Sequence, residues 1–256
     1  MSRLRVIPVL LADNGRLIKG AQFKKHKYIG DPTNAIKIFN EKEVDELMLL
    51  DITATSQQRE PDYNFLSEIS SEAFFPLGYG GGINSVGQIE RVMRLGIEKV
   101  VLGASAFMNP QLVRDAVAAV GSQSVVVSID YRTTLLRGTR VYIKNGKIST
   151  GSTPKDYARK MEDLGVGELI VTNIEREGTG RGYDVAMLSE LSRSLSIPIV
   201  ASGGAGKASD FIEARDIGNV QAVSAGSMFI FYGPHRAVLI NYPTYESMSD
   251  LFNRGF

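Results

Sequence analysis

The chain contains an internal repeat with one fixed spacing. Pro76–Gly82, with the sequence PLGYGGG, aligns with Pro198–Gly204, with the sequence PIVASGG, at an offset of 122 residues. The same gap-free offset pairs Glu46 with Glu168, Ile52 with Ile174, Gly96 with Gly218 and Ser105 with Ser227. Separate landmarks that share one spacing indicate a duplicated structural unit. We therefore expect a fold built from two similar halves.

Short apolar runs alternate along the chain with segments of helical periodicity. The expected strands are Val6–Leu11, Glu46–Ile52, Phe75–Tyr79, Lys99–Leu102, Val125–Ile129, Glu168–Thr172, Ile197–Ala201 and Ala222–Ser224. Helical stretches include Ser85–Leu95, Pro110–Val120, Pro154–Leu164 and Ala186–Leu195. Apolar runs without strict alternation suit parallel strands that are buried on both faces.

This pattern predicts the α/β class and a single (β/α)₈ barrel, because about 250 residues is the usual size of that fold. The two half-barrels should span about residues 1–122 and 123–240, followed by a C-terminal helical tail. The chain has 256 residues, so one domain accounts for all of it.

Composition excludes several kinds of partner and cofactor. The 29 Lys and Arg residues nearly balance the 28 Asp and Glu residues, which gives no electrostatic reason to expect nucleic acid or an anionic membrane. Cysteine is absent and the two histidines are far apart in sequence, so we expect no metal site and no other cofactor. No apolar run approaches the ~18 residues of a membrane span. We expect a cytoplasmic protein.

The loops after the first and fifth strands are long. Residues 13–30 and 131–151 each carry an Asn-Gly pair, at Asn14-Gly15 and Asn145-Gly146, which favours a hairpin. Loops that follow barrel strands form the catalytic face of this fold. These segments are therefore either surface hairpins or lids over that face, and we favour lids.

Glycine-rich turns follow several of the expected strands. Glycine lets the backbone approach an anion closely, and the next helix offers free N–H groups and the positive end of its dipole. The repeat places two such turns on opposite sides of one mouth, which suits a small molecule with a phosphate at each end. The alternative is that the glycines only make tight turns. The candidate phosphate-binding residues are Gly81, Gly82, Gly103, Ala104, Ser105, Gly178, Gly203, Gly204, Gly226 and Ser227.

Asp130 ends the apolar strand that begins at Val125. A carboxylate at the C-terminal end of a barrel strand faces the active-site cavity, where it can act as a general acid or base. Alignment of the first strand with the fifth places Leu11 opposite Asp130. A barrel that used paired carboxylates would need an aspartate at both positions.

Four charged residues lie near the opposite, N-terminal ends of the strands. Arg5, Glu46, Lys99 and Glu168 each precede or begin a different strand. Two basic and two acidic groups could close a ring of salt bridges across the barrel floor. From the residues alone, scattered surface charges are an equally good interpretation.

Several motifs, taken in order, resemble those of the cyclase subunit of imidazole glycerol phosphate synthase from about residue 4 to residue 235. They are DNGRLIKG (13–20), GDP (30–32), DELMLLDITA (45–54), GGGI (80–83), SVVVSID (124–130), GELIVTNI (167–174), GTGRGYD (178–184) and IPIVASGGAG (197–206). The resemblance implies a glutaminase docked on the N-terminal face in a heterodimer. It also implies ammonia passing through a charged gate, and a reaction with a bisphosphorylated ribulosyl substrate at the other face.

Carried over by residue, the gate of that family falls on Arg5, Glu46, Lys99 and Glu168. One catalytic aspartate falls on Asp130, whereas the other falls on Leu11, which cannot transfer a proton. Loss of a general acid or base typically costs about 10²–10⁴-fold in rate. The mouth departs further at Gly103, where the family has asparagine, and at residues 175–178, where Glu-Arg-Glu-Gly replaces Asp-Arg-Asp-Gly.

Other segments resemble a paralogous branch, the glycosyl amidation-associated proteins. They are NEKEVDELMLLDI, REPDY (59–63) and GPHRAVLINYP (233–243). The resemblance implies a barrel that passes ammonia from a glutaminase to an ATP-dependent sugar amidotransferase, which converts acetamido into acetamidino groups for surface polysaccharide. Two alternatives stay open. One is an authentic cyclase of histidine biosynthesis, and the other is a non-catalytic phosphate-binding scaffold.

Overall fold

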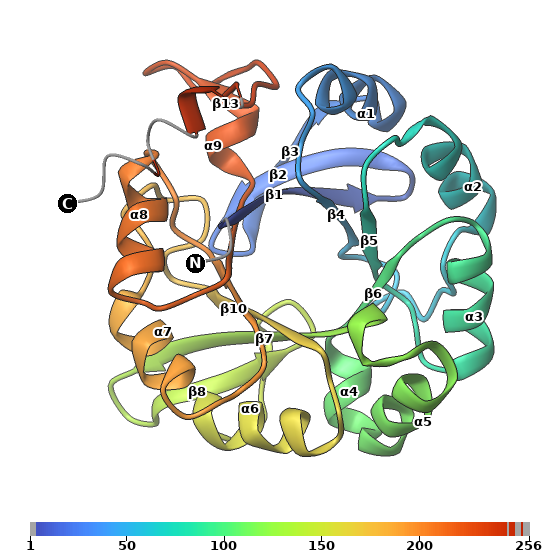
Figure 1. The fold of residues 1–256 in the computed structure, drawn as a ribbon, viewed down its shortest axis with the longest axis vertical. Helices are drawn as coiled ribbons and strands as arrows, with labels where there is room; N and C mark the ends of the chain where they lie inside the picture. Colours follow the sequence, from blue (N-terminus) through green and yellow to red (C-terminus); the bar gives the residue numbers. More distant parts are fainter. Residues whose placement is uncertain (1–3, 245, 249–251, 253–256) are drawn as a thin grey trace.

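The computed structural model describes residues 4–244, 246–248 and 252. Eight parallel strands close into a barrel, with the last strand beside the first, and helices surround them (Figure 1). The barrel strands are β1 (Arg5–Asp13), β4 (Leu47–Asp51), β5 (Leu77–Gly80), β6 (Lys99–Leu102), β7 (Val125–Thr134), β10 (Glu168–Asn173), β11 (Ile199–Ser202) and β12 (Ala222–Ala225). The prediction of one (β/α)₈ barrel is confirmed.

The helices occupy the intervals between these strands. They are α1 (Pro32–Glu41), α2 (Tyr63–Glu72), α3 (Val86–Arg94), α4 (Ala104–Met108), α5 (Pro110–Val120), α6 (Pro154–Asp163), α7 (Val185–Ser192), α8 (Ser209–Asp216) and α9 (Ser227–Ile230), with a 3₁₀ turn η1 (Ser122–Ser124). Five helices begin at a side chain that accepts a hydrogen bond from the backbone N–H three residues later, which satisfies a donor that the helix leaves free. These capping residues are Asp31, Asp62, Ser85, Thr153 and Asp184.

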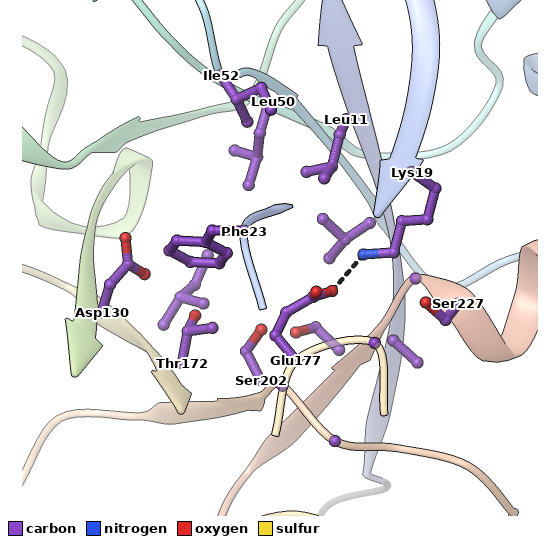
Figure 2. Close-up of a pocket in the computed structure, with 18 of the residues that line it drawn as sticks. Leu11, Lys19, Phe23, Leu50, Ile52, Asp130, Thr172, Glu177, Ser202 and Ser227 are labelled. Carbon is purple, nitrogen blue, oxygen red and sulfur yellow. Dashed lines mark hydrogen bonds and ion pairs between the residues drawn. The ribbon is translucent and has the colours of Figure 1, made fainter. Parts of the chain in front are cut away.

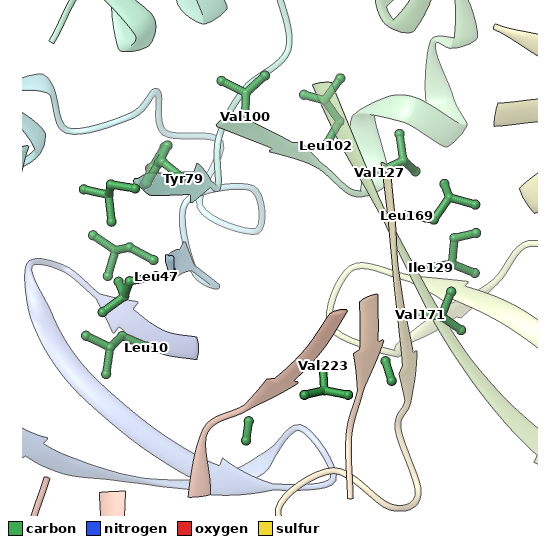
Figure 3. Packing of buried hydrophobic residues seen from close by; sticks show 14 of the residues in the cluster. Leu10, Leu47, Tyr79, Val100, Leu102, Val127, Ile129, Leu169, Val171 and Val223 are labelled. Atoms are coloured by element: carbon green, nitrogen blue, oxygen red, sulfur yellow. The ribbon is translucent and has the colours of Figure 1, made fainter. Parts of the chain in front are cut away.

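Alternation along the barrel strands divides the buried residues into two clusters. The larger cluster lies between the strands and the helices; Figure 3 shows part of it, including Leu47, Tyr79 and Val127. The smaller cluster fills the barrel interior. It contains Ile7, Met48, Val101, Val126, Ile170, Val200 and Ala222. Burial on both faces explains why these strands read as continuous apolar runs.

Several element boundaries differ from those expected. The expected strands at residues 75–79 and 197–201 begin later, at Leu77 and Ile199. In both cases a proline, Pro76 or Pro198, directly precedes the strand and lacks the N–H that the ladder requires. The helix expected to reach residue 195 ends at Ser192.

The first and fifth barrel strands run past their expected ends and continue as hairpins. The first hairpin adds β2 (Arg16–Ala21) and β3 (Lys24–Gly30), and the second adds β8 (Gly138–Ile143) and β9 (Ile148–Ser149). Both Asn-Gly pairs have positive φ. Asn14-Gly15 forms the two-residue turn between β1 and β2, and Asn145-Gly146 lies in the four-residue turn between β8 and β9. The prediction of hairpins at residues 13–30 and 131–151 is confirmed.

Each expected half of the chain contributes four barrel strands. β1, β4, β5 and β6 fall within residues 1–122, and β7, β10, β11 and β12 fall within residues 123–240. A last hairpin joins β13 (Phe231–Tyr232) to β14 (Ala237–Val238). The expected C-terminal helical tail lies largely outside the described residues. Within the part of the tail that is described, residues 246–248 are helical. Within the described part of the chain, no helix is long and apolar enough to cross a membrane.

Candidate functional site

The four charged residues at the N-terminal ends of the strands form a closed ring. Arg5 Nη1 donates to Glu46 Oε2 at 2.7 Å, and Arg5 Nη2 pairs with Glu168. Lys99 Nζ lies 2.9 Å from both Glu46 and Glu168. Both carboxylates are almost completely buried, whereas Arg5 retains 32% exposure of its side chain. The structure therefore places these residues in one charged ring rather than at scattered surface positions.

The barrel interior connects this charged ring to the mouth. Along β10, Glu168 lies in the ring, Ile170 in the interior apolar cluster and Thr172 at the mouth. These side chains share one face of the strand, because faces alternate with a period of two. Four residues of a strand span about 13 Å. Charge at one end thus gives way to an apolar interior and then to a polar mouth.

Asp130 lies at the mouth and beside Thr172 on the neighbouring strand. Burial raises the pKa of Asp130 to about 6, against hydrogen bonds from Ser128 and Thr172 that favour the ionised carboxylate. Ser128 Oγ lies 3.0 Å from Asp130 Oδ1. A carboxyl with a pKa near neutrality can act as either an acid or a base at physiological pH.

The opposite side of the mouth is apolar. Leu11 pairs with Leu50 in the β1–β4 ladder, and Val9, Leu50 and Ile52 line the same pocket (Figure 2). The side chain at position 11 therefore sits among aliphatic groups and offers no proton donor or acceptor opposite Asp130. The second carboxylate of this pocket, Glu177, pairs with Lys19. The catalytic role of Asp130 stays a prediction.

Two pockets flank Asp130, and both include Ser128, Leu50, Ile52 and Asn145. All ten candidate phosphate-binding residues line one or the other. The β5–β6 pocket, named for the strands that its turns follow, contains Gly81, Gly82, Gly103, Ala104 and Ser105. The β11–β12 pocket contains Gly178, Gly203, Gly204, Gly226 and Ser227.

Donors in these two pockets differ in their availability. In the β5–β6 pocket, the N–H of Gly82 donates to Thr55 Oγ1 at 3.3 Å. In the β11–β12 pocket, the Ser227 hydroxyl is buried without a hydrogen-bond partner among the described residues. The geometry brings the expected turns together at each pocket. Their assignment to phosphate stays a prediction.

Lys19 supplies a buried positive charge to the β11–β12 pocket. Its side chain is 2% exposed and pairs with Glu177, as Figure 2 shows. A Cβ at position 226 would lie 2.7 Å from Lys19 Nζ, so a larger residue at this turn would displace the ammonium group. His26 lines the same pocket, and burial together with the charge of Lys19 lowers the pKa of its imidazole.

The two hairpins form walls of the mouth. Phe23 and His26 of the first hairpin line the β11–β12 pocket, and Tyr142 and Asn145 of the second line the β5–β6 pocket. Hydrogen bonds hold both in place. Gln22 N donates to Glu177 O at 2.9 Å, and Asn145 Nδ2 donates to Ile52 O at 2.8 Å. The hairpins line both pockets of the mouth, and their action as lids stays a prediction.

Sequence reasoning did not single out Lys19, Phe23, His26 or Glu177 as site residues. Lys19 and His26 lie in β2 and β3 of the first hairpin, and Phe23 and Glu177 lie in turns. None of these segments was among the expected strands, so no pattern indicated where their side chains point. The available signal was their position in or beside segments that carry the family resemblance. No group of three His, Asp or Glu residues within the described ranges is arranged to hold a metal ion.

The fold and the mouth together define a class of protein. This is a duplicated (β/α)₈ barrel with two glycine-lined pockets on either side of the Asp130 carboxyl and a charged ring at the far end. A family model described as histidine biosynthesis protein matches residues 5–235. The chain therefore belongs to the histidine biosynthesis protein family, and this confirms the resemblance to the cyclase subunit.

Individual relatives match over nearly the whole chain. A Pseudomonas aeruginosa protein, provisionally named imidazole glycerol phosphate synthase subunit hisF2, is 45% identical over 95% of this chain and 97% of its own length. A similarly named HisF protein of Leptospira interrogans is 41% identical over 98% of this chain and 100% of its own. The imidazole glycerol phosphate synthase subunit HisF of Clostridium botulinum is 37% identical over 89% of this chain and 90% of its own length. This chain is a HisF-like barrel.

Proposed function

We propose that this barrel docks a glutaminase on its N-terminal face and passes ammonia through its interior to a reaction that a separate protein performs. The observation that carries the proposal is a combination of two features. The charged ring and the apolar interior of the family pattern are present, but the mouth has a proton-transferring group at only one of the two expected positions. The charged ring, the apolar interior and Asp130 follow one another along the barrel axis. Leu11 stands at the position where the family has its second proton-transferring group.

The interior suits a small neutral molecule. The side chains of its apolar cluster are aliphatic apart from Met48, so this cluster offers ammonia no group that would protonate it on the way. The charged ring closes the far end by direct ion pairs, so a passing molecule requires a partner to shift at least one of them. The relatives are named as subunits, which supports a protein partner.

The acceptor reaction that we propose is the conversion of an acetamido into an acetamidino group on a sugar, performed by an ATP-dependent amidotransferase. The segments at residues 59–63 and 233–243 support this choice through their resemblance to the glycosyl amidation-associated branch. In this arrangement the barrel contributes positioning and enclosure rather than proton transfer.

The first experiment measures cyclase turnover with the bisphosphorylated ribulosyl substrate and saturating ammonium salt, which removes the need for a glutaminase. We expect no significant turnover by the unmodified protein and measurable turnover by Leu11→Asp, because an added general acid or base contributes about 10²–10⁴-fold. Leu11→Asn is the matched control, since it adds polarity of similar shape without a proton-transferring group. Clear turnover by the unmodified protein would refute the proposal.

The second arm tests transfer directly. The barrel, a glutaminase and an ATP-dependent sugar amidotransferase from the same organism are mixed with ATP, and amidated sugar is measured with glutamine or with ammonium salt as nitrogen source. We expect the glutamine-driven reaction to require the barrel and the ammonium-driven reaction to proceed without it. If both proceed equally without the barrel, the proposed passage of ammonia is wrong.

An authentic cyclase is the second candidate, and one observation favours it. The pKa of Asp130 is raised by burial to about 6, which suits acid–base chemistry, and both flanking pockets are open around it. If the unmodified protein turns over, Asp130→Asn should abolish that activity.

A further inference from the structure

The β7–β8 hairpin ends in two leucines that are exposed to solvent. Leu135 is 103% exposed and Leu136 is 95% exposed, the two highest values among the large apolar side chains described. Single exposed apolar residues are ordinary on protein surfaces. An adjacent pair at one tip forms an apolar patch, and such patches mark contact sites.

The tip is held in an ordered hairpin. Thr134 pairs with Gly138 in the ladder, and the hydroxyls of Thr133 and Thr139 lie 2.8 Å apart. Arg137 N donates to Thr134 Oγ1 at 3.3 Å across the turn. The leucines are thus presented by a defined structure. Leu135 follows Asp130 by five residues, so the tip stands about 17 Å beyond the mouth along the strand.

The two hairpins around the mouth are strongly cationic. Residues 13–30 and 131–151 contain ten Lys and Arg residues and one acidic residue, Asp13, although the charges of the chain as a whole nearly balance. Arg137, beside the leucines, is exposed and makes no ion pair within the described residues. A partner that covers this face would meet positive charge around an apolar point.

We propose that the Leu135–Leu136 tip and the two cationic hairpins form the docking surface for the acceptor protein, which presents an acidic surface with an apolar pocket. This inference rests on the proposed function. Ammonia that reaches water at neutral pH is protonated and loses its nucleophilicity, so an acceptor has to cover the mouth. A cationic rim alone would also attract a phosphorylated small molecule, but two exposed leucines contribute nothing to binding a phosphate.

The test uses the full chain in its own cells, with a photo-crosslinking benzoylphenylalanine in place of Leu136. The crosslinked protein is identified, purified and titrated with the unmodified barrel and with three variants. Leu135→Ser combined with Leu136→Ser and, separately, Arg137→Glu should each weaken binding about tenfold or more. The first variant removes the apolar area that the partner would bury, and the second reverses a charge that faces an acidic surface. Phe74→Ser, at an exposed phenylalanine before β5 on the opposite face, should change binding less than about twofold.

Four outcomes would overturn the docking surface. They are no crosslink, a crosslink to a second copy of this chain, variants that bind the captured protein as tightly as the unmodified barrel does, and leucine-dependent sedimentation with phosphatidylglycerol vesicles. Glutamine-driven amidation separates this inference from the function. If transfer by the unmodified barrel is normal and the tip variants do not alter it, only the docking surface is wrong. If the unmodified barrel supports no transfer, the proposed function itself fails.

Discussion

Asp130 is the residue whose chemistry depends most on its surroundings. Its neighbours on β7 and β10 supply hydroxyl donors, yet burial dominates and raises its pKa to about 6. Across the mouth, Leu11 lies among aliphatic side chains. The residue types at positions 130 and 11 therefore decide whether this pair supplies one proton-transferring group or two.

Asp130→Asn should change stability in a pH-dependent way. A raised pKa means that the folded state favours the protonated carboxyl, so the stability that it contributes is present below pH ~4 and is lost as pH rises through about 6. The asparagine variant should therefore be more stable than the unmodified protein by on the order of 2 kcal/mol at pH 8 and nearly equal at pH 4. Urea unfolding between pH 4 and 8 measures this, and a difference that does not vary with pH would contradict it.

At the scale of elements, the hairpins determine the shape of the mouth. The first hairpin is fixed to the loop after β10, because Gln22 donates to the backbone of residues 175 and 177 through its side chain and its N–H. This loop is also where Glu177 reaches Lys19. The hairpin, the loop and the β11–β12 pocket thus form one connected unit.

Gly178→Ala should disturb that unit. Gly178 has φ +71°, and a Cβ there would lie 2.7 Å from Gly20 O and 2.8 Å from Ala21 Cα. We expect a loss of about 1–3 kcal/mol in the free energy of unfolding and faster tryptic cleavage at residues 24–27, because the hairpin has to move away. Gly151→Ala is the matched control, since φ is +78° and nothing lies within 4 Å of its Cβ. Equal effects of the two substitutions would show that the contact is unimportant.

At the scale of the whole molecule, the charged ring joins the two halves of the chain. Arg5, Glu46 and Lys99 come from the first half, and Glu168 comes from the second and pairs with both cations. The ring therefore ties strands that are far apart in sequence at the end of the barrel opposite the mouth. The ion pairs of the ring therefore contribute to the stability of the fold, and they also lie on the proposed path of ammonia.

Glu168→Gln should destabilise the protein by on the order of 3 kcal/mol, because it removes a buried carboxylate and leaves two partly buried cations facing one carboxylate. Urea unfolding measures the loss. Lys155→Met is the control, since it breaks the exposed Lys155–Glu190 pair at 3.8 Å and should cost less than about 1 kcal/mol. Adding Lys99→Met to Glu168→Gln should recover part of the loss. No recovery would show that the ion pairs act independently.

The fold was accessible from the sequence because its signals are local or periodic. Apolar runs predicted the strands, Asn-Gly pairs predicted both hairpins, and the repeat at 122 residues predicted the paired glycine turns. Prolines before β5 and β11 moved two strand starts by two residues, since pairing rather than hydrophobicity sets where a ladder begins. The candidate turns and Asp130 also met at one mouth, because barrel topology brings the ends of all strands together.

Only the tertiary structure decided how the charges pair. The residues alone left the four ring positions open between a ring and scattered charges, and only the family resemblance implied a gate. Nothing in the sequence indicated that Lys19 meets Glu177 across 158 positions. The pKa of Asp130 likewise follows from burial that several strands create together. Electrostatic energies depend on distance through space and on the exclusion of water, and neither is encoded in spacing along the chain.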